Sequence, residues 1–153
     1  MPTLGNRSGV HLYLNHTPDL SLGRSVPEMI QANGNHWRKI FSLYAKVLCK
    51  EGRWQTYRDQ QLLHEHALIF DASIVSEPAQ FIWVPGLENA KRLGLNPMEA
   101  KPILDDAKWA ENVRWKDGVL MTPYLDYRQF PNLLVDALRC WLSEQGYLDR
   151  NAP

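Results

Sequence analysis

The stretch "FIWVPGLENAKRLGL" (residues 81–95) decides the fold class that this sequence predicts. Its first four residues are a continuous apolar run of strand length. After the Pro-Gly pair that follows, Leu87, Ala90 and Leu93 fall on one side of a helix, and Gly94 can end that helix. A buried strand that leads directly into a helix is typical of α/β proteins.

Three more apolar runs of strand length lie outside this stretch. In the first of them, Val10, Leu12 and Leu14 alternate with two more polar residues, His11 and Tyr13. The other two, "ALIFDAS" (67–73) and "GVLMTP" (118–123), are continuous runs. Continuous runs suit parallel strands that are covered on both faces. Strands in this order, with helices between them, predict a three-layer α/β/α domain around a central, mostly parallel four-stranded sheet.

Amphipathic helices are expected between and after these strands. The clearest begins within "NGNHWRKIF" (33–41) and can end at Gly52, and its apolar residues share one face. A second is expected at residues 56–64 and a last one at residues 131–145, with Gly146 as its end. Together the elements predict a single α/β domain over residues 1–153, with residues 1–9 and 147–153 as flexible ends.

The entrance of the clearest helix combines capping and site-forming residue types. Asn33 or Asn35 can cap it, because a short side-chain oxygen accepts a hydrogen bond from an unpaired backbone N–H. Trp37 belongs to the apolar face. Neither capping nor core packing explains why Asn35 and His36 stand next to each other. We expect these two residues at a helix end that faces the strand ends.

Composition and charge limit the classes of function. Hydrophobic residues make up 44% of the chain and charged residues 22%, as in folded globular proteins. Seventeen Lys and Arg balance seventeen Asp and Glu, so the formal net charge is zero. Proteins that hold long stretches of duplex are usually basic. The balance therefore argues against extended nucleic-acid binding but leaves room for a local patch.

Several motif classes are absent from the sequence. No apolar run suits a signal peptide or a membrane span, so we expect a cytoplasmic protein without a membrane partner. The phosphate-loop and dinucleotide fingerprints and the nucleophile elbow are missing, and no cofactor is expected. Cys49 and Cys140 are expected to be small buried hydrophobic residues within helices. His64 and His66 flank Glu65, but a third metal ligand is not evident, so no metal is expected.

Polar side chains follow three of the expected strands. "LNHTPD" (14–19) follows the first, Asp71 the second and "TPYLDYR" (122–128) the fourth. Ligands of open α/β sheets bind beyond the carboxyl ends of the strands, so these residues predict a polar cleft. The sequences "TPD" and "LDYR" are also good turns, because Pro fixes φ and Asp accepts hydrogen bonds from nearby backbone amides. Both interpretations stay open.

In their order along the chain, these segments resemble the uracil-DNA glycosylase-like superfamily, in particular its mismatch-specific and deoxyinosine-type branches. "TPDLSL" (17–22) is similar to the first loop of the family, and "GNHWRKIF" (34–41) to its "N-x-F-W" helix entrance. "QLLHEHALIFDAS" (61–73) resembles its leucine-rich helix, apolar strand and Asp. The third strand with its helix, and the last strand with its Pro-containing loop and final helix, follow in the same order. The similarity covers most of residues 10–146.

The resemblance implies a nucleobase N-glycosidase that acts on a flipped base, with DNA, a nucleobase or a nucleotide as its partner. In such an enzyme Asn15 or Asp19 would orient or activate water, assisted by His16. Trp37 or Tyr124 would stack on the base, and Arg128 would contact phosphate. The expected ligand-binding residues are Asn35, His36, Trp37, Asp71, Tyr124, Asp126 and Arg128.

Both loops of this chain depart from the family pattern. The first loop of the family usually carries a Gly-rich sequence with an Asp or Asn that positions water, where this chain has "LNHTPD". Its last loop carries a His- or Ser-rich Pro motif, where this chain has "TPYLDYR". The alternative is a non-catalytic module on the same fold that binds a ligand or a protein. Enzyme activity and oligomeric state stay open.

Overall fold

Two compact units make up the chain in the computed structural model, which describes residues 3–50, 52–76 and 80–148. The sheet unit comprises Met1–Thr17 and Glu65–Tyr124, and the helical unit comprises Pro18–His64 and Leu125–Pro153. The single-domain organisation expected from the sequence stays a prediction.

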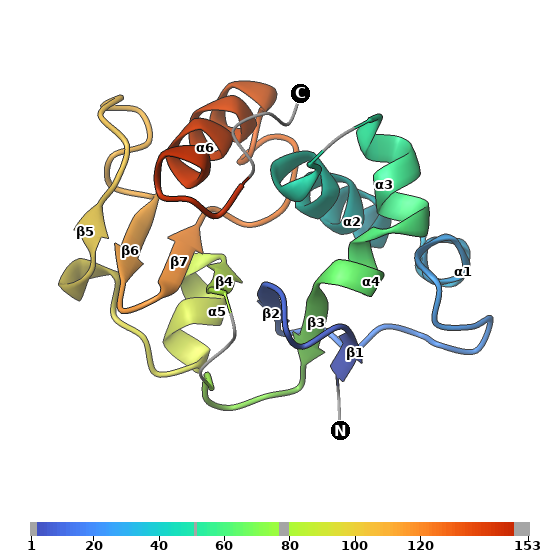
Figure 1. Ribbon diagram of the computed structural model, residues 1–153. Coiled ribbons are helices and arrows are strands. Elements are labelled where there is room, and N and C mark those ends of the chain that lie inside the picture. The colour runs from blue at the N-terminus through green and yellow to red at the C-terminus, as the bar shows by residue number, and fades with distance from the viewer. Residues whose placement is uncertain (1–2, 51, 77–79, 149–153) are drawn as a thin grey trace. The chain divides into compact units, whose positions relative to one another are not determined.

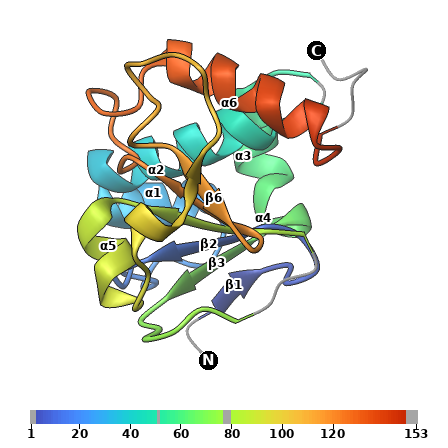
Figure 2. The ribbon, with the colours of Figure 1, turned by 90° about the vertical axis from the view of Figure 1, so that its left-hand side faces the viewer.

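The sheet unit holds a mixed sheet of seven strands (Figure 1). Their order across the sheet is β1-β3-β2-β4-β7-β6-β5, and Figure 2 shows β1, β3 and β2 as neighbours. The four central strands β3, β2, β4 and β7 are parallel, whereas β1, β6 and β5 pair in antiparallel fashion at the two edges. The bounds are β1 Thr3–Gly5, β2 His11–Leu14, β3 Ala67–Phe70, β4 Ile82–Pro85, β5 Lys101–Pro102, β6 Arg114–Lys116 and β7 Val119–Thr122.

The α/β class is therefore correct, but the expected three-layer domain around a four-stranded, mostly parallel sheet is wrong. The four apolar runs do form β2, β3, β4 and β7. The sheet continues beyond them through three short edge strands, and six α-helices accompany it within the described residues. Two of these strands, β5 and β6, have no buried residue and so lack the apolar pattern that marks a strand.

The expectation of flexible ends, at residues 1–9 and 147–153, stays a prediction. Residues 1–2 and 149–153 of the ends expected to be flexible lie outside the described residues. Within the described part, residues 3–5 form β1, which pairs with β3, and Leu148 is buried.

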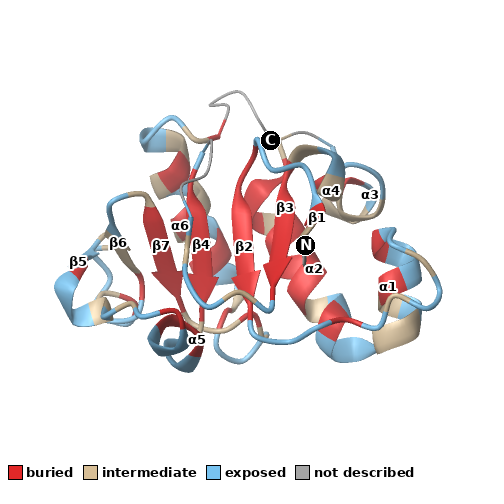
Figure 3. Ribbon diagram, turned by 90° about the horizontal axis from the view of Figure 1, so that it is seen from below, coloured by how far each residue is buried: buried red, intermediate tan, exposed pale blue. Residues whose placement is uncertain are grey.

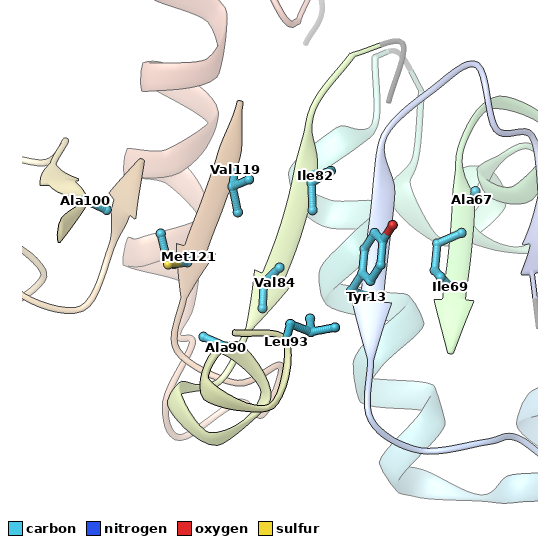
Figure 4. Close-up of a cluster of buried hydrophobic side chains, with 10 residues drawn as sticks. All are labelled: Tyr13, Ala67, Ile69, Ile82, Val84, Ala90, Leu93, Ala100, Val119 and Met121. Atoms are coloured by element: carbon cyan, nitrogen blue, oxygen red, sulfur yellow. The ribbon is translucent and has the colours of Figure 1, made fainter. Parts of the chain in front are cut away.

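The core of the sheet unit is built by the alternation of side chains along the central strands. Tyr13, Ile69, Val84 and Met121 point to one face of the sheet (Figure 4). Ala90 of α5 (Leu87–Arg92) and Leu93, directly after this helix, pack against them. The residues that alternate with them along each strand point to the other face of the sheet and are buried as well (Figure 3). Burial on both faces is what parallel central strands require.

The helical unit is arranged around its longest helix. Its members are α1 (Val26–Asn33), α2 (Asn35–Leu48), α3 (Trp54–Gln60) and α6 (Asn132–Glu144), while α4 (Leu62–Glu65) lies where the chain passes into the sheet unit. Helix α2 packs against α1, α3 and α6, and its apolar face is buried as predicted. From α6, Arg139 donates hydrogen bonds to the backbone oxygens of Lys46 and Val47, which satisfies carbonyls at the end of α2.

The junction between α1 and α2 is built differently from the prediction. The N-cap of α2 is Gly34, with a φ of 82°, and no side chain caps the helix. Asn33 instead donates from Nδ2 to the backbone oxygens of Met29 and Asp19, while its Oδ1 accepts from the Asp19 N–H. The expected capping by Asn33 or Asn35 is therefore wrong, because Gly34 adopts the positive φ and the Asn33 amide holds the preceding loop.

Candidate functional site

The strand order of the sheet unit creates a topological switch point between β2 and β4. The chain passes from β2 to β3 on one side, and β4 then pairs with β2 on its other side. The central strands all point the same way, so their carboxyl ends share one edge of the sheet (Figure 3). In doubly wound α/β folds this is where ligands bind.

Three predicted site residues come together at this edge. Asn15 and His16 directly follow β2, and Asp71 directly follows the neighbouring strand β3. All three are exposed. Asp71 has a φ of 62°, a left-handed conformation that is uncommon for a residue with a side chain. An amide, an imidazole and a carboxylate are thus presented by two adjacent strand ends.

Two side chains of α5, buried Asn89 and exposed Arg92, tie these strand ends together. Asn89 of α5 donates from Nδ2 to the backbone oxygens of Tyr13, at 2.8 Å, and Pro85, at 3.1 Å. Its Oδ1 accepts a hydrogen bond of 2.8 Å from Arg92, which also donates to the backbone oxygens of Leu14 and Ala72. The carboxyl ends of β2, β3 and β4 are therefore held in one arrangement by α5.

Tyr124, another predicted ligand-binding residue, lies beyond the end of β7 and is half-buried. A Cβ built on Gly86, directly after β4, would lie 3.2 Å from the Tyr124 ring. The absence of a side chain at Gly86 lets this ring approach the end of β4 closely. Tyr124 is thus the aromatic candidate within the sheet unit.

Asp19, a predicted catalytic residue, belongs to the helical unit and serves a turn there. Its carboxylate accepts a hydrogen bond of 2.8 Å from the backbone N–H of Ser21. That bond, with a further contribution from the Ser21 side chain, lowers the pKa of Asp19 from its ordinary value of 3.8. A carboxylate with a lowered pKa is a weaker proton acceptor at neutral pH, so the geometry favours the turn interpretation of "TPD".

Asn35, His36 and Trp37 form the first turn of α2 in the helical unit. Asn35 and His36 are exposed, whereas only 4% of Trp37 is exposed and its ring packs against Phe41 with centroids 5.7 Å apart. The buried ring leaves little surface on which a base could stack. The structure therefore places Trp37 in the core and leaves Asn35 and His36 as surface residues.

Asp126 and Arg128 form a turn before α6. The Asp126 carboxylate accepts a hydrogen bond of 2.8 Å from the backbone N–H of Arg128. Between them, exposed Tyr127 has the ammonium groups of Lys39 and Lys46 at 5.7 Å and 5.2 Å from its ring centroid. Sequence reasoning passed over this cation–aromatic cluster, because Lys39 and Lys46 are far from Tyr127 along the chain.

Potential metal ligands are dispersed within the described residues, where no group of three His, Cys, Asp or Glu could hold an ion. Buried His66 accepts a hydrogen bond of 2.9 Å at Nδ1 from the Val10 backbone N–H.

Within the described residues, no helix is long and apolar enough to cross a bilayer.

Comparison with known proteins assigns most of the chain to one family. A model described as "Family of unknown function (DUF6942)" matches residues 4–143. This match begins in β1 and ends in α6, so it spans both units. No curated protein and no solved structure matched the chain.

Proposed function

The chain belongs to a family of unknown function, DUF6942, and from its geometry we propose that it binds a nucleobase at the carboxyl edge of its parallel strands. The observation that carries the proposal is the switch point between β2 and β4, with Asn15 and His16 directly after β2. Such a position is the usual ligand site of an open α/β sheet.

The side chains at this edge match the hydrogen-bonding edge of a base. The Asn15 amide offers both a donor and an acceptor, and a neutral His16 ring offers one of each. The Asp71 carboxylate accepts hydrogen bonds from ring or exocyclic N–H groups of a base. The similarity of "TPDLSL" (17–22) and "GNHWRKIF" (34–41) to uracil-DNA glycosylase-like proteins supports the same ligand class.

Binding without excision is the form that the geometry favours. Excision requires a water oxygen to bond to the sugar C1′ while the C1′–N bond breaks, and the base leaves with the bonding electrons and takes up a proton. Asp19, the carboxylate expected to activate that water, accepts a backbone hydrogen bond in a turn and has a lowered pKa. Release of a base is therefore an outcome to be measured rather than part of the proposal.

The test is a titration of the ¹⁵N-labelled chain with uracil, hypoxanthine, their nucleosides, and oligonucleotides that carry these bases unpaired. We expect saturable shifts of the Asn15, His16 and Asp71 resonances. Asn15→Ala should weaken binding about tenfold, the loss expected for one or two hydrogen bonds to the ligand. The matched control is Asn112→Ala, which changes an exposed asparagine of the sheet unit that follows no parallel strand.

Base release is measured in parallel on duplexes with uracil, hypoxanthine or mismatched thymine, by detection of abasic sites. Release that Asn15→Ala abolishes would extend the function to excision. Binding without release identifies a binding module. If no base, nucleoside or oligonucleotide shifts these resonances, or if Asn15→Ala and Asn112→Ala bind equally well, the proposal is wrong.

A further inference from the structure

The helical unit contains a pocket of about 420 Å³ that lies between the end of α2, the start of α3 and the first turns of α6. This volume falls within the range of about 300–1,000 Å³ that is usual for small-molecule sites. The residues expected from the sequence to form a site are not among those that line it. The lining consists of Lys46, Cys49, Gly52, Trp54, Asn132, Val135, Asp136 and Arg139.

Lys46 gives this pocket a positive charge. Among the described residues, its ammonium group contacts only neutral side chains. Its ammonium group lies 4.8 Å from the centroid of the Trp54 ring and 5.2 Å from that of Tyr127. It donates one hydrogen bond, of 3.3 Å, to Oδ1 of Asn132. An ammonium group has three donors, and a half-buried one is less screened by water than one at the open surface. Lys46 can therefore bind an anionic oxygen.

The remaining lining limits the shape and charge of the ligand. Buried Cys49 and Val135 form an apolar part of the wall, and half-buried Trp54 adds an indole ring. Arg139 is held by its hydrogen bonds to α2 and adds positive potential from a fixed position. The carboxylate of exposed Asp136 also lines the pocket. It would repel a second negative charge on the ligand, which favours a monoanion over a phosphate dianion.

We propose that this pocket binds a small aromatic monocarboxylate. The carboxylate accepts charge-assisted hydrogen bonds from the Lys46 ammonium group, which are stronger than neutral ones. The aromatic body contacts Val135, Cys49 and the Trp54 indole, where an aromatic pair adds to the burial of apolar surface. All residues that line this pocket belong to the helical unit, so binding there does not depend on the nucleobase site.

The experiment is a titration of the full ¹⁵N-labelled chain with benzoate and indole-3-acetate, and with benzamide as the neutral counterpart of benzoate. We expect a saturable shift of the Trp54 indole N–H with both anions and at least about tenfold weaker binding of benzamide. Lys46→Met keeps much of the apolar stem and removes the charge, and should weaken benzoate binding about tenfold. Its matched control is Lys39→Met, since Lys39 also contacts Tyr127 but does not line the pocket. The control should bind benzoate within about twofold of the unchanged chain.

Three results would overturn the proposal. The first is the lack of a saturable shift at Trp54 with either anion. The second is an equal effect of Lys46→Met and Lys39→Met. The third is binding of inorganic phosphate at least as tight as that of benzoate. If Lys46→Met fails to fold, Asp136→Asn replaces it, because removal of this exposed like charge should tighten benzoate binding about two- to fivefold. Unchanged or weaker binding by Asp136→Asn would contradict the site.

Discussion

Asn89 and Tyr13 are joined by a buried hydrogen bond of 2.8 Å from the Asn89 side-chain amide to the Tyr13 backbone oxygen. The same amide nitrogen also donates to Pro85 at the end of β4. Asn89 therefore connects the two strands that flank the switch point. A substitution at this position tests whether α5 holds the strand ends in place.

Asn89→Asp keeps the shape of the side chain but replaces both donors with a carboxylate oxygen that faces two carbonyl oxygens. Because Asn89 is only 2% exposed, water cannot compensate for the lost bonds. We expect the free energy of unfolding to fall by about 2–4 kcal/mol, measured by urea denaturation. Glu88→Gln, at an exposed position of the same helix, is the control and should change it by less than about 0.5 kcal/mol. Equal stability of the two variants would show that the Asn89 bonds do not hold the strand ends.

Trp83 and Thr122 form a second buried pair, between β4 and β7. The indole N–H of Trp83 donates to the Thr122 hydroxyl at 2.9 Å, and that hydroxyl donates to the Pro123 backbone oxygen. Thr122→Val preserves the volume and leaves a buried N–H without its acceptor, so we expect a loss of about 1–3 kcal/mol in thermal or urea unfolding. Thr122→Ser keeps the hydroxyl and should lose less.

A double variant checks the cause of that loss. Trp83→Phe removes the donor, so adding Thr122→Val to it should cost less than Thr122→Val alone. Strict additivity of the two substitutions would mean that packing, and not the hydrogen bond, accounts for the destabilisation.

The part of the fold that the sequence predicts is the part whose strands are buried on both faces. β2, β3, β4 and β7 each have four buried residues, which produce the apolar runs. The edge strands lack that signal, because β5 has two exposed residues and β6 none that are buried. One available signal was missed. Asp117 and Gly118 between β6 and β7 both have positive φ, and an Asp-Gly pair is a strong indicator of a hairpin.

The candidate site was predictable to a lesser extent. Asn15, His16 and Asp71 follow recognisable strands, so their position at the carboxyl edge could be inferred. Asp19 and Asp126 are aspartates like Asp71, but their carboxylates accept hydrogen bonds from the backbone amides two residues further along the chain. Turn formation and ligand binding require the same side chains, so the sequence could not separate them. The Asn89–Arg92 pair depends on contacts between α5 and strands remote in sequence.

The lowered pKa of Asp19 predicts a pH dependence with a definite sign. Its folded-state pKa lies below the ordinary value of 3.8, because the ionised form accepts the Ser21 N–H. The contribution to stability is therefore fully present above that value and is lost as the pH falls through the lower folded-state pKa. We expect an NMR titration of the Asp19 carboxyl to have its midpoint below 3.8. Ser21→Pro removes the N–H donor and should raise that midpoint towards the ordinary value, while Ser21→Ala keeps the donor and should shift it less. A midpoint that Ser21→Pro leaves unchanged would mean that this bond is not the cause.

Gly9 allows the backbone before β2 to approach the segment before β3. A Cβ at this position would lie 1.9 Å from the Glu65 backbone oxygen and 2.6 Å from Nδ1 of His66. Since the first of these atoms belongs to the backbone, it cannot move aside as a flexible side chain would. Gly9→Ala should therefore displace the chain and lengthen the bond from the Val10 N–H to His66, which is 2.9 Å long and buried. We expect a loss of at least about 3 kcal/mol in urea denaturation.

The control for this substitution is Gly118→Ala. Gly118 has a φ of 81°, but a Cβ there would meet no atom within 4 Å. This variant carries only the strain of a left-handed backbone, which is about 1–2 kcal/mol. If Gly9→Ala is less destabilising than Gly118→Ala, the backbone next to Gly9 does not approach Glu65 as closely as the structure has it. If it is more destabilising, its Val10 amide should also exchange faster with solvent than in Gly118→Ala, because the His66 acceptor has been pushed away.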